Sequence, residues 1–228
     1  LNIGNGTVPT VDDDMIRYVY SDPPEYYSYF TDRAILTTKN EYVNHINNII
    51  LDQMPGKAII FHSYDSVPDD TRGLYQQEFL NSITSNGLPP HELRLKVGSP
   101  IMCLRNLDPM NGLCNGTRLV CRTFYPNLIE AIITTGNCKG NIVFLPRIPL
   151  IPPENVKLPF TLKRKQFPVR PAFALTINKS QDQTIPRVGL YLPEHVFTHG
   201  QLYVAFSRAK SQHDIKILVK MEIFQEHK

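Results

Sequence analysis

A short apolar run that stops abruptly in polar residues is the feature that most constrains the fold. Residues 172–176 read Ala-Phe-Ala-Leu-Thr, and a polar elbow follows at residues 178–184. An apolar run of this length is typical of a strand buried on both faces, which offers chemistry only at its end. In open α/β sheets, ligands bind at the carboxyl ends of the strands. The hydroxyls, amides and single ammonium of the elbow therefore predict a phosphate-binding edge.

Flanking segments predict a parallel sheet around this strand. Residues 33–38 form an apolar run, and Asn40 can cap the helix after it, whose apolar residues recur at helical spacing. Residues 57–62 read as the next strand, and a strand–helix–strand unit with short links predicts parallel pairing. Residues 188–192 and 215–219 predict two further strands of the same sheet.

The middle of the chain changes character after Lys96. Short apolar segments alternate there with glycine-containing turn signals, and helical periodicity does not return before residue 178. Four strands are predicted, at residues 97–104, 117–124, 128–134 and 141–145. Residues 146–171 are dense in proline and cannot be helical. This pattern is typical of the strands of a small β-barrel.

The charge of the chain is informative only through its distribution. The 24 basic and 21 acidic residues give a net charge of +3, too mild to identify a nucleic-acid binder. Residues 156–171 contain no acidic residue, and Lys163, Arg164 and Lys165 are three consecutive cations within them. By charge alone a solvated loop explains this run, but its place directly before residues 172–176 favours phosphate binding.

Composition argues against two classes of protein. The four cysteines form no C-x-x-C pair, so we expect reduced thiols and no metal site. His195 and His199 lie four apart as in zinc proteases, but no Glu follows His195 and Pro193 interrupts the helix before it. Each apolar run is broken by proline or charge well before eighteen residues, so we expect no membrane partner.

Two segments carry a specific resemblance to a known family. Residues 170–184, Arg-Pro-Ala-Phe-Ala-Leu-Thr-Ile-Asn-Lys-Ser-Gln-Asp-Gln-Thr, resemble motif V of the superfamily 1B DNA helicases, and residues 201–209, Gln-Leu-Tyr-Val-Ala-Phe-Ser-Arg-Ala, resemble motif VI. Within that superfamily the chain is most similar to the petite-integration-frequency (PIF) family. Residues 79–90, 97–108 and 111–119 resemble the helicases of Helitron transposons in particular.

The resemblance implies a RecA-like second motor domain, called 2A, interrupted by an inserted Src-homology-3-like barrel, called 2B. Residues 1–28 would be an extended lead-in from the first motor domain. Residues 29–95 and 169–228 would form the two parts of domain 2A. Residues 96–168 would form the barrel with its basic, proline-rich return.

The resemblance also implies roles for individual residues. Arg208 would be the arginine finger that stabilises charge developing on the γ-phosphate, although a surface salt bridge is the alternative for any lone arginine. The expected nucleotide-binding residues are Gln181, Asp182, Gln201 and Tyr203. The expected DNA-binding residues are Thr37, Thr38, Asn40, Thr176, Asn178, Lys179, Ser180, Lys163, Arg164 and Lys165. For Thr37, Thr38 and Asn40, which match motif IV, a simple helix cap is an equally good explanation.

Two departures from the family pattern concern the nucleotide. The family has Gly where this chain has Asp182, and an aspartate places an anion where a phosphate should approach. The pattern G-x-x-x-x-G-K-[ST] does not occur. We therefore expect ATP and Mg²⁺ to be held mainly by an N-terminal motor domain of the same polypeptide, and this chain alone to be inactive.

The resulting prediction is the C-terminal half of an ATP-dependent 5′-to-3′ DNA helicase. Its expected partners are single-stranded DNA and junctions of single- and double-stranded DNA, and it would act as a monomer. It would serve DNA repair, recombination and telomere maintenance in the nucleus, with mitochondria as a second compartment. The alternatives are a non-catalytic nucleic-acid-binding remnant of a Helitron helicase, and a protein-interaction module built on the barrel.

Overall fold

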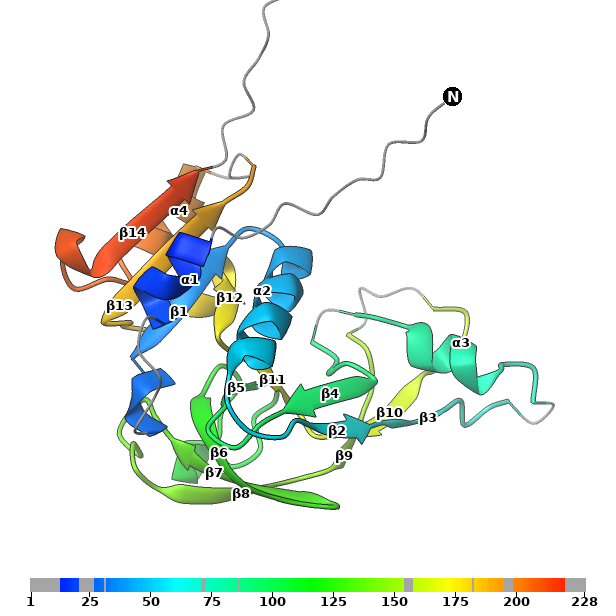
Figure 1. Ribbon diagram of the computed structural model, residues 1–228. Coiled ribbons are helices and arrows are strands. Elements are labelled where there is room, and N and C mark those ends of the chain that lie inside the picture. The colour runs from blue at the N-terminus through cyan, green and yellow to red at the C-terminus, as the bar shows by residue number, and fades with distance from the viewer. Residues whose placement is uncertain are drawn as a thin grey trace, which may run out of the picture. The chain divides into compact units, whose positions relative to one another are not determined.

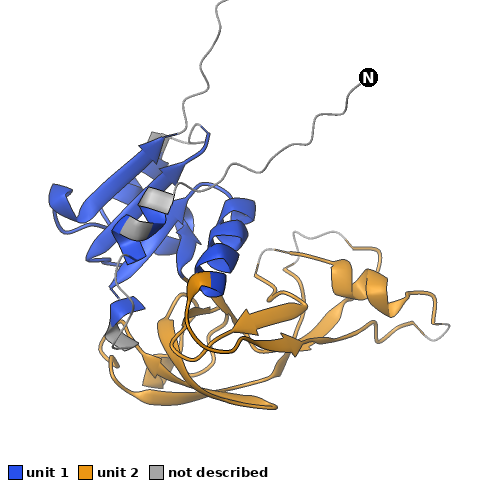
Figure 2. Ribbon diagram, in the orientation of Figure 1, with its two compact units in different colours: residues 1–52, 173–228 blue, residues 53–172 orange. Residues whose placement is uncertain are grey.

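The computed structural model describes residues 13–20, 27–30, 32–70, 73–85, 87–153, 158–181, 183–194 and 199–219. The chain forms two compact units (Figures 1 and 2). Unit 1 comprises residues 1–52 and 173–228, and unit 2 comprises residues 53–172. Asp182 lies outside the described residues, so its expected role stays a prediction from sequence.

Unit 1 is built on a four-stranded parallel sheet in the order β12-β1-β13-β14. The strands are β1 (Arg33–Thr37), β12 (Ala174–Thr176), β13 (Arg187–Leu192) and β14 (Ile215–Val219). The central strand β1 pairs Ile35 with Ala174 on one side and Leu36 with Leu190 on the other. Its apolar residues are fully buried, as expected of a parallel strand covered on both faces. The predicted parallel sheet is confirmed.

Helices and short 3₁₀ turns complete unit 1. They are α1 (Asp13–Tyr20), α2 (Asn40–Gln53), α4 (His199–Phe206), and the 3₁₀ turns η1 (Tyr27–Phe30), η3 (Ile177–Ser180) and η4 (Gln212–Asp214). Helix α1 packs on β13, where a side chain in place of Gly189 would collide with Met15 and Val19. The extended lead-in expected for residues 1–28 is therefore wrong over α1, because its buried apolar residues form a helical face.

Unit 2 is an antiparallel β domain. A five-stranded sheet has the order β11-β5-β6-β7-β8, and smaller sheets have the orders β2-β4 and β3-β10-β9. The larger sheet comprises β5 (Pro100–Cys103), β6 (Arg118–Tyr125), β7 (Leu128–Ile133), β8 (Ile142–Pro146) and β11 (Val169–Pro171). The smaller sheets comprise β2 (Ile59–His62), β3 (Tyr64–Ser66), β4 (Glu92–Leu95), β9 (Ile148–Leu150) and β10 (Lys163–Gln166). Helix α3 (Gln77–Ser82) and the turn η2 (Pro109–Asn111) lie between strands.

One hydrophobic core joins the β2-β4 pair to the five-stranded sheet. Phe61 of β2 and Leu93 and Leu95 of β4 are buried with the inward-facing residues of β5, β6, β7 and β8. This shared interior agrees with the predicted small β-barrel-like insertion. Among the described helices the longest, α2, has 14 residues, and none is long and apolar enough to cross a membrane.

The parallel partner predicted for β1 was wrong. Strand β2, expected to follow α2 in the parallel sheet, instead pairs antiparallel with β4 in unit 2. The chain returns to unit 1 only at β12, so all of unit 2 interrupts the crossover between β1 and β12. The divisions expected at residues 95 and 168 accordingly lie at 52 and 172. A short apolar run such as residues 57–62 shows that a strand forms but does not determine its partner.

Candidate functional site

Polar segments gather at one edge of the unit 1 sheet because parallel strands all end on the same side. Thr38 and Lys39 follow β1 and lead into α2. The turn η3 follows β12, and Glu194 comes shortly after β13. We call this edge the rim. It is the position at which the sequence predicted phosphate chemistry.

Arg208 folds onto the rim. Its Nη1 donates to the carbonyl oxygens of Ser180 and Gln183, each at 3.3 Å, and its Nε donates to the carbonyl of Val204 at 3.0 Å. Its own carbonyl accepts from the backbone N–H of Ile185 at 2.9 Å. Helix α4, which precedes Arg208, packs against η3. The two segments that resemble motifs V and VI therefore meet at one guanidinium.

The side chain of Ser180 stabilises the elbow from inside. Ser180 is fully buried, and its Oγ donates to the carbonyl of Ile177 at 2.7 Å. The expectation that this hydroxyl contacts DNA is wrong in this structure, because the hydroxyl closes the turn. The neighbouring side chains of Asn178, Lys179 and Gln181 are exposed, and Thr176 is half-buried.

On the β1 side of the rim, Thr37 and Thr38 have different environments. Thr37 is fully buried, and within the described part of the chain its Oγ1 has no hydrogen-bond partner, so its expected contact with DNA is also wrong. Thr38 is half-buried and its Oγ1 donates to Glu194 Oε1 at 3.3 Å. Asn40 begins helix α2, whose first backbone N–H groups can attract an anion.

Lys39 and Glu194 form a rim ion pair that the sequence reasoning missed. Lys39 Nζ lies 2.6 Å from Glu194 Oε2, and both side chains are partly exposed. The hydrogen bond to Glu194 raises the pKa of Lys39, which keeps the ammonium charged. Their positions in the sequence could have indicated that both residues lie on the rim. Lys39 lies between two predicted rim residues, and Glu194 lies just beyond the end of a predicted strand.

The two nucleotide-binding candidates on α4 differ in exposure. Gln201 is buried, whereas Tyr203 is 76% exposed. Residues two apart on a helix point in different directions, so these side chains cannot share one face of α4. Of these two side chains, only that of Tyr203 is accessible to a ligand.

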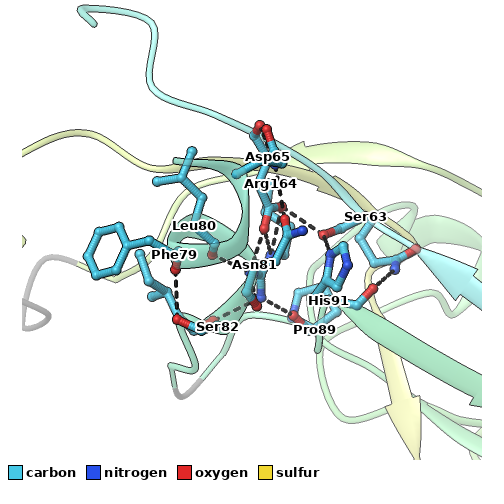
Figure 3. A network of polar contacts seen from close by, with 12 residues as sticks. Ser63, Asp65, Phe79, Leu80, Asn81, Ser82, Pro89, His91 and Arg164 are labelled. Carbon is cyan, nitrogen blue, oxygen red and sulfur yellow. Dashed lines mark hydrogen bonds and ion pairs between the residues drawn. The ribbon is translucent and has the colours of Figure 1, made fainter. Parts of the chain in front are cut away.

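The basic run separates into two kinds of residue on β10. Lys163 and Lys165 are exposed, but Arg164 is fully buried against Asp65 (Figure 3). Its remaining N–H groups donate to backbone carbonyls, including those of Leu80 and Pro89. The expectation that Arg164 binds DNA is wrong in this fold, because its donors are already used inside unit 2.

Metal-ligating side chains do not gather into a centre in the described part of the chain. No group of three or more His, Cys, Asp or Glu side chains there could hold a metal ion. All four cysteines are free thiols. Burial raises the pKa of both Cys103 and Cys121.

The chain is similar to known helicases over most of its length. Residues 78–124 match the family model described as "DNA helicase Pif1, 2B domain". The ATP-dependent DNA helicase PIF1 of Danio rerio is 31% identical over 185 residues, which cover 80% of this chain and 27% of that protein. The human ATP-dependent DNA helicase PIF1 is 30% identical over 188 residues, covering 80% of this chain and 26% of the human protein.

A solved structure shows the same fold. The Pif1 helicase of Candida albicans has a TM-score of 0.64 at 24% identity, covering 91% of this chain and 49% of that one. The chain thus spans about a quarter of the length of the curated relatives that it matches. The family model, the relatives and the fold agree that this chain is, over most of its length, similar to one part of the PIF1 helicases.

Proposed function

We propose that this chain supplies the second motor domain and the inserted β domain of an ATP-dependent DNA helicase. Unit 1 corresponds to domain 2A and unit 2 to domain 2B. The names of the relatives support the activity, and the family-model match, which lies in unit 2, supports the second assignment. The observation that carries the proposal is the position of Arg208 on the elbow after β12.

Arg208 acts on the nucleotide in this proposal. ATP, held with Mg²⁺ mainly by an N-terminal motor domain of the same polypeptide, supplies a γ-phosphate whose charge a guanidinium can stabilise. The contacts from Arg208 to Ser180 and Gln183 are long for N–H···O bonds, so a phosphate oxygen can replace them with stronger, charge-assisted bonds. The exposed Gln181 and Tyr203 flank the nucleotide, the buried Gln201 supports helix α4 behind them, and Asp182 follows Gln181 in the chain.

The rim contacts the DNA backbone in the same proposal. Lys179, Asn178 and Thr176 offer an ammonium, an amide and a hydroxyl on the elbow, while Thr38 and Asn40 lie at the start of α2. Phosphate contacts of this kind are indifferent to base sequence, which suits a translocating motor. Because Arg208 and Lys179 share one elbow, movement of Arg208 towards a phosphate also changes the support of the DNA-binding side chains.

The finer parts of the proposal rest on the resemblance alone. They are 5′-to-3′ movement, action on single-stranded DNA and its junctions with duplex, a monomeric state, and a nuclear location with mitochondria as a second compartment. Descent from a Helitron transposon is supported by residues 79–90 and 111–119. Roles in repair, recombination and telomere maintenance belong to the same group.

A second candidate is a nucleic-acid-binding remnant without ATPase activity. It is favoured by Asp182 in place of the family's Gly, because a carboxylate there repels phosphate. In the full-length protein, Asp182→Gly would then raise DNA-stimulated ATP hydrolysis. An unchanged rate would count against this explanation of any inactivity.

The test of the first proposal is ATP hydrolysis by the full-length protein that contains this sequence. Arg208→Lys keeps the charge and removes the planar fork, so the DNA-stimulated rate should fall on the order of 10³-fold. Affinity for single-stranded DNA and the thermal midpoint should stay near those of the parent. Lys210→Gln, on an exposed cation two residues away, is the matched control. Retention of the rate in Arg208→Lys would refute the finger, and a wild-type protein without DNA-stimulated hydrolysis would support the remnant.

A further inference from the structure

The small sheet of β3, β10 and β9 in unit 2 has one exposed and one buried face. In the antiparallel register, Lys165 lies opposite Tyr64 on one side and Pro149 on the other, and Lys163 lies opposite Ser66. Residues directly opposite each other share a face of the sheet. These five residues are all exposed, and none of them is acidic. We call this surface the β10 face.

The orientation of the β10 face is fixed by what lies behind it. Arg164 alternates with Lys163 and Lys165 on β10, and it lies opposite Asp65 in the register. The Arg164–Asp65 ion pair is buried, with side chains 1% and 0% exposed. A slip by one residue would expose this pair and bury two lysines, so the register is strongly specified. Both ammonium groups are thereby held on the solvent side.

Tyr64 is the aromatic centre of the β10 face. It is 68% exposed, which is unusual for a large aromatic residue within a strand. The guanidinium carbon of Arg147 lies 5.7 Å from the centroid of its ring. Arg147 is itself held by hydrogen bonds to the His62 carbonyl at 2.7 Å and to Gln166 Oε1 at 3.1 Å. The ring thus has a fixed cationic neighbour and leaves most of its surface accessible.

We propose that the β10 face binds single-stranded nucleic acid, with Tyr64 stacked on a base and Lys163 and Lys165 contacting neighbouring phosphates. An exposed ring beside cations is the combination with which proteins bind single strands without sequence preference. Duplex DNA presents its bases already stacked, so the ring favours a single strand. The inference rests on the proposed function for the class of partner, but it uses no residue of the rim.

The experiment measures binding of the 228-residue chain to a fluorescein-labelled oligothymidylate by anisotropy. Tyr64→Ala should weaken binding about fivefold to a hundredfold, whereas Tyr64→Phe should bind like the parent because it keeps the ring. Tyr125→Ala, on an exposed ring of β6 in the same unit, is the matched control and should have no effect. The thermal midpoint of each variant shows whether unit 2 stays folded.

The two lysines are tested through the salt dependence. Lys163→Gln with Lys165→Gln should reduce the slope of log affinity against log salt by about 1.4, because each phosphate neutralised on a single strand adds about 0.7 to that slope. Lys139→Gln, on an exposed lysine elsewhere in unit 2, should leave the slope unchanged. A 2-aminopurine placed in the oligonucleotide should lose fluorescence on binding to the parent and not to Tyr64→Ala, which reports stacking directly.

The outcomes separate this inference from the proposed function. If Tyr64→Ala binds like the parent while Lys179→Gln on the rim weakens binding, the β10 face is refuted and the rim proposal stands. If Tyr64→Ala weakens binding and Lys179→Gln does not, the reverse holds. Equal weakening by Tyr64→Ala and Tyr125→Ala, or stronger binding of a duplex of the same length, would also refute the inference.

Discussion

The guanidinium of Arg164 and the carboxylate of Asp65 form a buried ion pair across two paired strands, with Nη2 and Oδ2 2.6 Å apart. Arg164 also donates to the carbonyls of Leu80, Ile83 and Pro89. One side chain therefore connects β3, β10, the last turn of α3 and the loop after it (Figure 3). A buried pair is tolerated when its remaining polar atoms are satisfied in this way.

Replacing Arg164 should destabilise unit 2 strongly. In Arg164→Met, Asp65 loses its cation and keeps a buried charge, which costs about 3–5 kcal/mol in comparable cases. Urea unfolding measures the loss. Lys163→Met, one residue away on the exposed face, should change stability by less than about 0.5 kcal/mol. Equal stability of the two variants would show that the pair is not buried in solution.

A substitution at Ser180 tests whether its hydroxyl stabilises the elbow or contacts DNA. Ser180→Ala removes the 2.7 Å bond to the Ile177 carbonyl and should cost about 1 kcal/mol of unfolding free energy. Affinity for single-stranded DNA should stay unchanged, because the hydroxyl is buried. Lys179→Gln, the exposed neighbour, should show the opposite pattern, with stability retained and with a lower affinity and a smaller salt slope. Weaker DNA binding by a folded Ser180→Ala variant would restore the role expected from the sequence.

If the rim binds DNA as proposed, Glu194 would compete with DNA phosphate for Lys39 and Thr38. Glu194→Gln removes the carboxylate charge from a site that Lys39 and the start of α2 make attractive to anions. Affinity for single-stranded DNA should therefore rise, by about twofold to fivefold for a partly exposed pair. Titration at low salt is the measurement, because screening weakens the effect. Weaker binding in Glu194→Gln would mean instead that Glu194 holds Lys39 in the position that DNA requires.

His91 should make unit 2 less stable in mild acid. Its Nδ1 lies 2.8 Å from Ser63 Oγ, and that hydroxyl donates to Asp65. Burial lowers the pKa of His91, although the charge of Asp65 opposes the shift. The unfolded chain, in which histidine has a pKa of about 6.5, therefore takes up the proton first as the pH falls. Stability is retained above that value and decreases below it, towards the folded pKa.

The contribution of His91 is isolated by comparing urea midpoints at about pH 7.5 and about pH 5.5, on either side of the unfolded pKa. His91→Asn keeps an amide donor near Ser63 and removes the titrating group, so the decrease between the two pH values should become smaller. An undiminished decrease would assign the pH dependence to other groups of the protein.

Local sequence patterns predicted the four strands of the unit 1 sheet well, but not helix α1. The apolar run of residues 33–38 and the polar elbow after residue 176 are found where they were expected, because burial on both faces leaves a clear apolar pattern. The contact between Arg208 and the elbow likewise joins the two segments that the sequence identified as similar to motifs V and VI. By contrast, the sequence pattern did not indicate the strand that contains Tyr64, since a three-residue strand leaves almost no periodicity.

The errors concern side-chain burial and strand partners. Nothing in Lys163-Arg164-Lys165 distinguishes the middle cation from its neighbours until Asp65, 99 residues away, is known to lie opposite it. Thr37 and Ser180 are similar cases, because a hydroxyl at a strand end can face inwards or outwards. Such choices depend on contacts between distant segments, which one sequence does not display.

The interrupted crossover has a consequence for the order in which the protein folds. Ile35 and Ala174 are paired neighbours although they lie 139 positions apart in the sequence, and the continuous segment 53–172 lies between them. During synthesis, unit 2 leaves the ribosome complete while β1 still lacks its neighbour β12. Because segments with near partners fold sooner, we expect protease resistance to appear first in unit 2 of a stalled nascent chain. We expect the apolar strand β1 to stay accessible to chaperones until residues 174–176 have emerged.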